Sequence, residues 1–222
     1  MWQGNFYRIV RVGSRIVHAG WRSEVPVPEE ACVYVCSHHN MHGPILTLTL
    51  LDFPVHAWVL HVFFDRESCR KQYAEYTFSK RFGMPQPVAN ALAWLVSGVI
   101  SGLVRSTGAI AVWRGTSKIH ATFRESLEAL KKGESVLIFP DVEYSAENEG
   151  IGAMYDGFLL LGRMYTRAEG RGLPFVPLYC DEKSKRVVQG EPVVFRADAP
   201  YREESERVKN ELAQRINEMA QK

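Results

Sequence analysis

The chain has 222 residues, of which 46% are hydrophobic, enough to build the core of one domain of ordinary size. Its formal net charge of +2 argues against a nucleic-acid-binding protein, because such proteins carry a strong basic stripe. The four cysteines lie at positions 32, 36, 69 and 180 without CxxC spacing, so we expect reduced thiols in a cytoplasmic protein without a secretory signal peptide.

The first 23 residues form a basic and partly apolar segment. They contain four arginines and no acidic residue, and the apolar side chains fall near helical spacing on one side. The apolar residues are Trp2, Phe6, Ile9, Val10, Ile16 and Val17, and the arginines are Arg8, Arg11, Arg15 and Arg22. Two interpretations stay open: a helix on an anionic membrane surface, or a helix packed on the protein with its arginines in solvent. We treat residues 1–23 as an amphipathic N-terminal segment and residues 24–222 as a single domain.

Three histidines, His38, His39 and His42, lie close together in residues 37–44. The apolar run before them, residues 32–36, is typical of a central strand. After them, Gly43 lets the backbone bend and Pro44 suits the first turn of a helix. We therefore expect the histidines between a strand end and a helix N-terminus, the usual place for chemistry in an open α/β sheet.

The histidines suggest a general base more than a metal site. A metal needs three or four ligands, and although His39 and His42 could share a helical face, no second cluster of His, Cys or Asp stands at ligand spacing. A general base needs one imidazole and a group to orient it. Packed or solvated histidines without a chemical role are the alternative.

The next segments alternate between strand and helix patterns. Residues 56–64 predict a strand and residues 66–81 a charged helix. Residues 88–104 contain no charge, but this stretch is shorter than the ~20 residues needed to cross a bilayer, so we expect a buried or membrane-dipping helix. Residues 108–114 predict a strand that closes on Arg114.

The second half of the chain continues this alternation. We expect a helix that begins after Thr116 or Ser117 and ends at Gly133, a strand over 136–139 and an acidic loop over 141–156. A helix over 158–167, a strand over 175–179 and a hairpin-like segment through 187–195 should follow. The chain should close with a helix that carries Val208, Leu212, Ile216 and Met219 on one face. This order predicts an α/β fold with a largely parallel central sheet covered by helices.

Four blocks of the chain, in order, resemble the motifs of the glycerolipid acyltransferase family, which includes bacterial lysophosphatidic acid acyltransferases. Residues 37–44 are similar to its S-N-H-Q-S-x-x-D block, and residues 108–114 to its glycine, apolar strand and arginine. Residues 139–145 are similar to F-P-E-G-T-R-S, and residues 175–178 to its V-P-V strand. The resemblance extends over roughly residues 30–195, nearly the whole domain.

The resemblance implies transfer of a fatty acyl group from an acyl thioester, on coenzyme A or acyl carrier protein, to a hydroxyl of a lysophospholipid or glycerol phosphate. It implies His39 as the general base and Arg114 as a ligand for an anionic group. Backbone groups at Gly43 or Asp141 are candidate oxyanion donors. Lys118 and Tyr144 complete the expected substrate-binding residues. We expect no cofactor, a lipid acceptor, and a peripheral position at the inner face of the membrane.

The sequence departs from the family where the chemistry lies. Pro44 stands in place of the aspartate that holds the histidine ring, and Tyr144 in place of an arginine. A working site therefore needs another carboxylate beside His39, and Asp141 and Glu143 are the candidates, with Glu143 preferred. The alternative function is a non-catalytic lipid-binding protein that keeps the fold.

Overall fold

The computed structural model describes residues 3–143 and 150–221 of the chain. It divides into two compact units, one made of residues 1–10 and 57–122 and the other of residues 11–56 and 123–222. The chain thus passes between the units three times, within α1 (Asn5–Val17), β3 (Val55–Leu60) and α5 (Ile119–Lys131). This division does not follow the boundary that we placed between residues 23 and 24.

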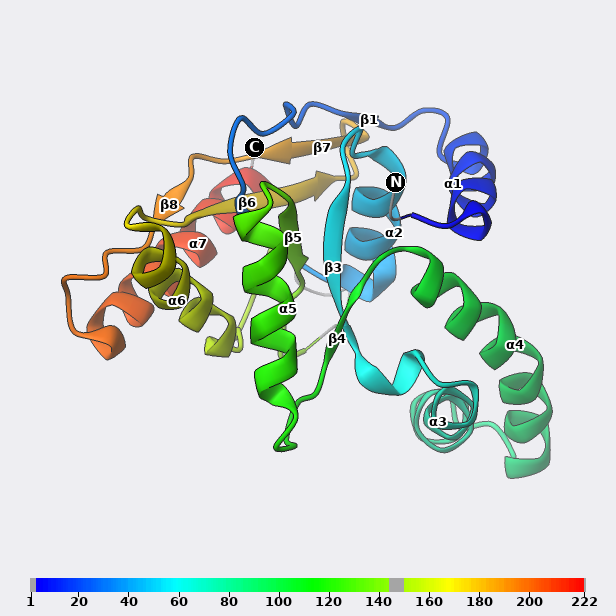
Figure 1. The fold of residues 1–222 in the computed structure, drawn as a ribbon. Coiled ribbons are helices and arrows are strands. Elements are labelled where there is room, and N and C mark those ends of the chain that lie inside the picture. Colours follow the sequence, from blue (N-terminus) through cyan, green and yellow to red (C-terminus); the bar gives the residue numbers. More distant parts are fainter. Residues whose placement is uncertain (1–2, 144–149, 222) are drawn as a thin grey trace. The chain divides into compact units, whose positions relative to one another are not determined.

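The second unit is built on a mixed sheet in the order β1-β7-β6-β2-β5, with β8 also paired to β6 (Figure 1). Its strands are β1 (Arg22–Ser23), β2 (Val33–Cys36), β5 (Ser135–Ile138), β6 (Pro174–Asp181), β7 (Arg186–Gln189) and β8 (Val193–Val194). The central strands β5, β2 and β6 run parallel, whereas β7 and β8 pair antiparallel with β6. The side chains of β2 and β5 are all buried, which explains their continuous apolar sequence.

Helices of the same unit pack on this sheet. They are α2 (His42–Leu50), α6 (Leu160–Glu169), which follows a 3₁₀ turn over Gly157–Leu159, and α7 (Tyr201–Ala220). Both α2 and α7 contact β6. The expected face of the C-terminal helix is confirmed, because Val208, Leu212 and Ile216 are completely buried.

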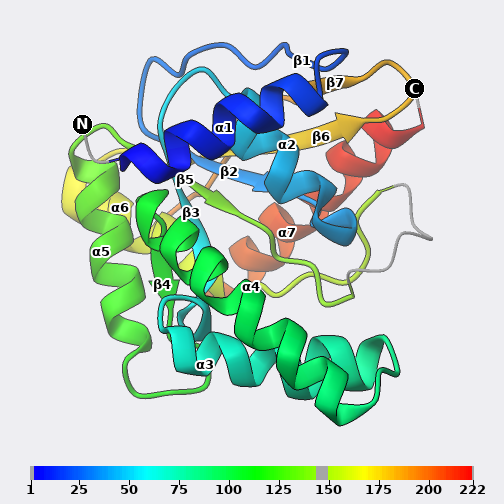
Figure 2. The ribbon, with the colours of Figure 1, turned by 90° about the vertical axis from the view of Figure 1, so that its right-hand side faces the viewer.

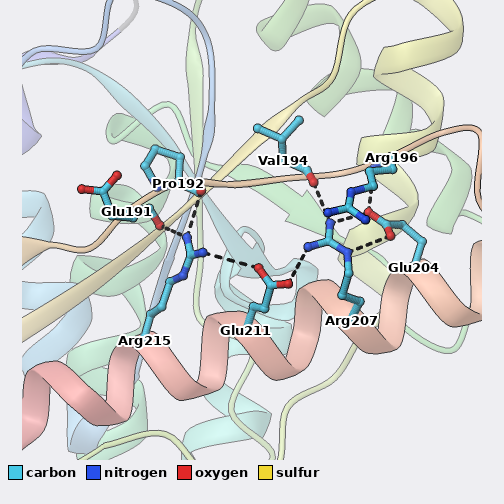
Figure 3. A network of polar contacts seen from close by, with 8 residues as sticks. All are labelled: Glu191, Pro192, Val194, Arg196, Glu204, Arg207, Glu211 and Arg215. Carbon is cyan, nitrogen blue, oxygen red and sulfur yellow. Dashed lines mark hydrogen bonds and ion pairs between the residues drawn. The ribbon is translucent and has the colours of Figure 1, made fainter.

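An ionic network fastens α7 to the segment around β8 (Figure 3). Glu204 is buried and accepts hydrogen bonds from the Arg196 N–H at 2.7 Å and from the Arg207 guanidinium. Arg207 also donates to Glu211 and to the Val194 carbonyl. Burial alone would raise the pKa of Glu204, but the hydrogen bonds and charges of the two arginines outweigh it and leave that pKa below its usual value.

The first unit contains β3 paired in parallel with β4 (Ile110–Val112), together with a set of helices. These are a 3₁₀ turn over His61–Phe63, α3 (Arg66–Lys71), the π-helix η3 (Gln72–Arg81) and α4 (Gln86–Ser106). The predicted strand over 56–64 was too long, since the chain leaves the strand at Leu60 and the His61 ring stacks on Trp113. The predicted helix over 66–81 is α-helical only to Lys71.

Helix α4 is longer and more exposed than we expected. The helix has 21 residues and is long and apolar enough to cross a membrane by length and composition alone, since an 18-residue stretch of it has a mean hydropathy of 1.6. The buried positions form a stripe of small residues, Ala89, Ala93, Ser97 and Ser101, spaced four apart, which permits close packing. Val88, Trp94, Leu95 and Val99 are exposed. The interpretation as a buried helix is therefore wrong, and a membrane-dipping role stays a prediction.

Candidate functional site

The parallel strands β5, β2 and β6 bring the candidate residues of the second unit to one edge of the sheet. Val35 on β2 pairs with Ile138 on β5, and Cys36 pairs with Leu178 on β6. Because parallel strands have their carboxyl ends at the same edge, the segments that follow them are neighbours. The histidines follow β2, as the sequence predicted, and Asp141 follows β5.

Asp141 fastens the start of the histidine loop, which we define as residues 37–42. Its Oδ1 accepts a hydrogen bond from Ser37 Oγ at 2.9 Å, and its Oδ2 accepts one from the His38 backbone N–H at 2.8 Å. The side chain is buried, and burial raises the pKa of Asp141 above its usual value although the two hydrogen bonds act in the opposite direction. Asp141 therefore works as a structural clamp on the loop.

The backbone of the histidine loop is tightly wound. A 3₁₀ turn over His39–Met41 leads directly into α2, and both His39 and Met41 have left-handed φ values, 36° and 81°. The N–H groups of Met41 and Gly43 both donate to the His38 carbonyl, at 3.0 and 3.3 Å. Left-handed backbone at residues other than glycine is costly and often occurs where a side chain must be aimed.

Gly43 is required by this winding. A Cβ atom at this position would lie 2.0 Å from the Ser37 carbonyl oxygen, far inside any real contact. Because the Gly43 N–H already donates to His38, the backbone of Gly43 supports the loop rather than presenting a free donor to an oxyanion.

Two imidazoles and one carboxylate meet beside the loop. Oε1 of Glu182 lies 2.7 Å from Nδ1 of His42 and 3.8 Å from Nε2 of His39. The two rings stack with their centroids 5.9 Å apart and their planes inclined by 20°. The side chain of His39 is 22% exposed, and those of His42 and Glu182 are about half exposed. An imidazole that touches both a carboxylate and solvent can accept a proton and release it.

The acids that the sequence proposed as partners of His39 lie elsewhere. Both oxygens of Asp141 are engaged by Ser37 and His38, and Glu143 is exposed. Among the described residues, the carboxylate within ion-pair distance of His39 belongs to Glu182. In the same part of the chain, no group of three His, Cys, Asp or Glu side chains is placed to hold a metal ion.

The expected substrate-binding residues are divided between the units. Arg114 and Lys118 belong to the first unit, where both are exposed and the Lys118 ammonium lies 4.8 Å from the centre of the Trp113 ring. Gly43 belongs to the second unit with the histidines. Tyr144 lies outside the described residues.

Sequence reasoning did not find Glu182. The expected strand over 175–179 ended too early, because β6 continues to Asp181 and Glu182 follows it directly. The available signal was the position of an acid just after a strand that could run parallel to the histidine-bearing strand.

No protein-family model matches this chain, and no curated protein matches it. Among solved structures, the chain is similar to the 1-acyl-sn-glycerophosphate (LPA) acyltransferase PlsC from Thermotoga maritima, with a TM-score of 0.54 at 12% sequence identity. The match covers 96% of this chain and 79% of that chain. At such low identity the similarity shows the fold alone. The predicted α/β fold, a largely parallel sheet covered by helices, is confirmed.

Proposed function

We propose that the protein transfers a fatty acyl group from an acyl thioester to a hydroxyl of a lysophospholipid-like or glycerol phosphate-like acceptor. The donor is acyl-CoA or acyl-acyl carrier protein. The observation that carries the proposal is the histidine loop, fastened by Asp141 at the carboxyl edge of a sheet whose fold resembles that of an LPA acyltransferase. The resemblance of four sequence blocks to the family motifs supports the same activity.

In the proposed reaction His39 is the general base. The acceptor hydroxyl attacks the thioester carbonyl while the His39 imidazole takes the hydroxyl proton. The tetrahedral intermediate collapses, the carbon–sulfur bond breaks, and the imidazolium returns the proton to the leaving thiolate. No covalent acyl-enzyme is needed, so the neighbouring Ser37, whose hydroxyl donates to Asp141, has a structural role. Arg114 is the candidate ligand for an anionic group of acceptor or donor.

Helix α1 is fastened to the C-terminal end of α2 through two of its arginines. Nε of Arg11 and of Arg15 each donates to the Thr49 carbonyl at 3.0 Å, Arg11 also donates to the Leu51 carbonyl, and Arg15 lies 2.5 Å from Asp52. Figure 2 shows the C-terminal half of α1 crossing α2. These two cations satisfy carbonyls at the C-terminus of α2, where positive charge is favourable. One of the two interpretations expected a helix packed on the protein with its arginines in solvent: the helix does pack on the protein, but Arg11 and Arg15 bind backbone carbonyls of that protein.

The opposite side of α1 is apolar and exposed. Ile9, Val12, Ile16 and Val17 are 61–80% exposed, and no acidic residue occurs between positions 1 and 23. Such a helix fits the interface of a bilayer, with its apolar side in the acyl boundary. Since Arg11 and Arg15 are engaged by the protein, membrane attachment rests mainly on apolar burial. The exposed apolar residues of α4 are a second candidate contact with lipid.

The competing function is lipid binding without turnover, and the replacement of the family aspartate by Pro44 favours it. Incubation of the purified protein with acyl-CoA or acyl-acyl carrier protein and a panel of lysolipids and glycerol phosphate separates the two. We expect acylated product with at least one acceptor. Tight lipid binding without product in every combination would support the non-catalytic function instead.

A further inference from the structure

We infer that Glu182 is the positioning carboxylate of His39 and takes the part that the motif assigns to the residue at position 44, which is proline in this chain. The inference rests on the proposed acyl transfer, and it concerns the same histidine loop. It replaces the expectation that Asp141 or Glu143 was recruited for this purpose.

The contact with His42 fixes the carboxylate. Nδ1 of His42 lies 2.7 Å from Glu182 Oε1, an ion-pair distance at which a proton on Nδ1 attracts the carboxylate and holds the Glu182 side chain in place. The stacked arrangement of the two rings then leaves the same carboxylate 3.8 Å from His39 Nε2. His42 thus holds the Glu182 carboxylate in place, and that carboxylate in turn lies beside the His39 ring.

The position of the carboxylate decides which nitrogen of His39 does the chemistry. Glu182 lies at ion-pair distance from Nε2, and its negative charge favours a proton on that nitrogen, which leaves Nδ1 with a free lone pair for the acceptor hydroxyl. When Nδ1 takes that proton, the ring becomes a cation next to an anion. Glu182 stabilises this cation without becoming protonated, as the buried aspartate does in a serine-protease triad.

The hairpin that carries Glu182 is tied at both ends. Asp181 pairs with Arg186 across β6 and β7, so the intervening turn has four residues. The Asp181 carboxylate accepts hydrogen bonds from the Lys183 N–H at 2.9 Å and from the Ser184 hydroxyl. Lys185 has a left-handed φ of 55°. A short turn held in this way presents Glu182 in a defined direction rather than from a free loop.

Glu182→Gln keeps the size of the side chain and removes its charge, so it tests the inference by kinetics. We expect kcat to fall on the order of 10²-fold with KM nearly unchanged, less than the ~10⁴-fold loss in a serine-protease triad because Glu182 is about half exposed. Glu182→Asp should be intermediate, since it keeps the charge but is shorter. Glu206→Gln on α7, another exposed carboxylate, is the matched control and should behave as the unmodified protein.

A spectroscopic measurement reports the contact itself. In ¹⁵N spectra of the histidines we expect the Nδ1-protonated form of His42 in the unmodified protein and its loss in Glu182→Ala. If Glu182→Gln and Glu206→Gln have equal kcat, the inference is overturned while acyl transfer stands. The same holds if Glu182→Ala leaves the tautomer of His42 unchanged. Absence of turnover by the unmodified protein with every acceptor overturns both the acyl transfer and the positioning role, and the ¹⁵N result then reports a structural contact only.

Discussion

Asp141 accepts a hydrogen bond from the backbone N–H of His38 at 2.8 Å, so the segment after β5 holds the segment after β2. The second carboxylate oxygen accepts a hydrogen bond from the Ser37 hydroxyl, and both Ser37 and Asp141 are buried. The acid that the motif places near the chemistry thus accepts its two hydrogen bonds from the Ser37 hydroxyl and from the backbone of the histidine loop.

The raised pKa of Asp141 predicts a pH-dependent loss of stability. A native pKa above the usual value of 3.8 means that the folded state binds more protons than the unfolded state between the two values. This contribution to the free energy of unfolding is therefore greatest at low pH and is lost as the pH rises through that window. In Asp141→Asn the free energy of unfolding should not decline in this way. Urea unfolding of the unmodified protein and of Asp141→Asn from about pH 3.5 to pH 7 measures the difference. If the free energies of the two proteins change in parallel with pH, the raised pKa does not belong to Asp141.

Gly43→Ala should disrupt the histidine loop, because its Cβ would lie 2.0 Å from the Ser37 oxygen. We expect the free energy of unfolding to fall by about 2 kcal/mol or more, together with most of the acyl transfer. Gly13→Ala in α1 is the matched control. No atom lies within 4 Å of its added Cβ, so it should be neutral or stabilising by about 0.5–1 kcal/mol. Similar losses in both variants would show that the close approach is not the cause.

His39→Ala should cause the largest loss of turnover among the three histidine variants, on the order of 10²–10⁴-fold, if His39 is the general base. His42→Ala should cause a smaller loss, because it frees Glu182 without removing the base. His38→Ala should retain measurable turnover. Single-turnover rates with one acceptor compare all three. Equal losses would point to packing or to a metal rather than to one base.

Vesicle sedimentation tests the exposed side of α1. Val12→Glu with Ile16→Glu should weaken binding at least tenfold, since each apolar side chain buried at the interface contributes about 1.5–3 kcal/mol. Deletion of residues 1–22 should reduce binding further. Arg11→Gln should lower the free energy of unfolding more than it lowers vesicle binding, because Arg11 is engaged by the Thr49 and Leu51 carbonyls. If neither the double substitution nor the deletion changes vesicle binding, α1 is not the membrane contact.

Glu204→Ala should destabilise the second unit by about 2–4 kcal/mol, since it leaves the Arg196 N–H and part of Arg207 without their acceptor. Glu206→Ala, two residues further along α7 and exposed, should change stability by less than about 0.5 kcal/mol. The lowered pKa of Glu204 adds a pH signature of opposite sign to that of Asp141. Its contribution is present above the usual pKa of 4.5 and is lost as the pH falls below it.

The sequence was sufficient to predict the alternation of elements and the place of the histidines, because buried parallel strands and capped helices leave strong local patterns. Residues 32–36 and 136–139 were recognisable as strands from their composition alone. Contacts between residues that follow different strands depend on how the strands are aligned, and they could not be predicted from composition. Whether His39 meets Asp141, Glu143 or Glu182 is decided by how far β6 extends past β2, and no local pattern encodes that distance.

The local sequence also could not predict which side of α1 faces the protein. An amphipathic helix normally packs its apolar side inward, but here Arg11 and Arg15 bind the open carbonyls at the end of α2. The sequence of α1 does not contain this information, since the decisive groups are backbone oxygens of another helix.

Helix α2 sets the reach of the proposed enzyme. It begins at His42, beside the reactive ring, and its final carbonyls are the ones held by the arginines of α1. Nine residues at 1.5 Å each make a stiff rod of roughly 14 Å. If α1 rests on a bilayer, the imidazole lies within about 14 Å of the contact between α1 and α2, and an acceptor must extend its hydroxyl from the bilayer to that point. Adding or removing one turn of α2 would move the histidine by about 5 Å and so change which headgroups can reach it.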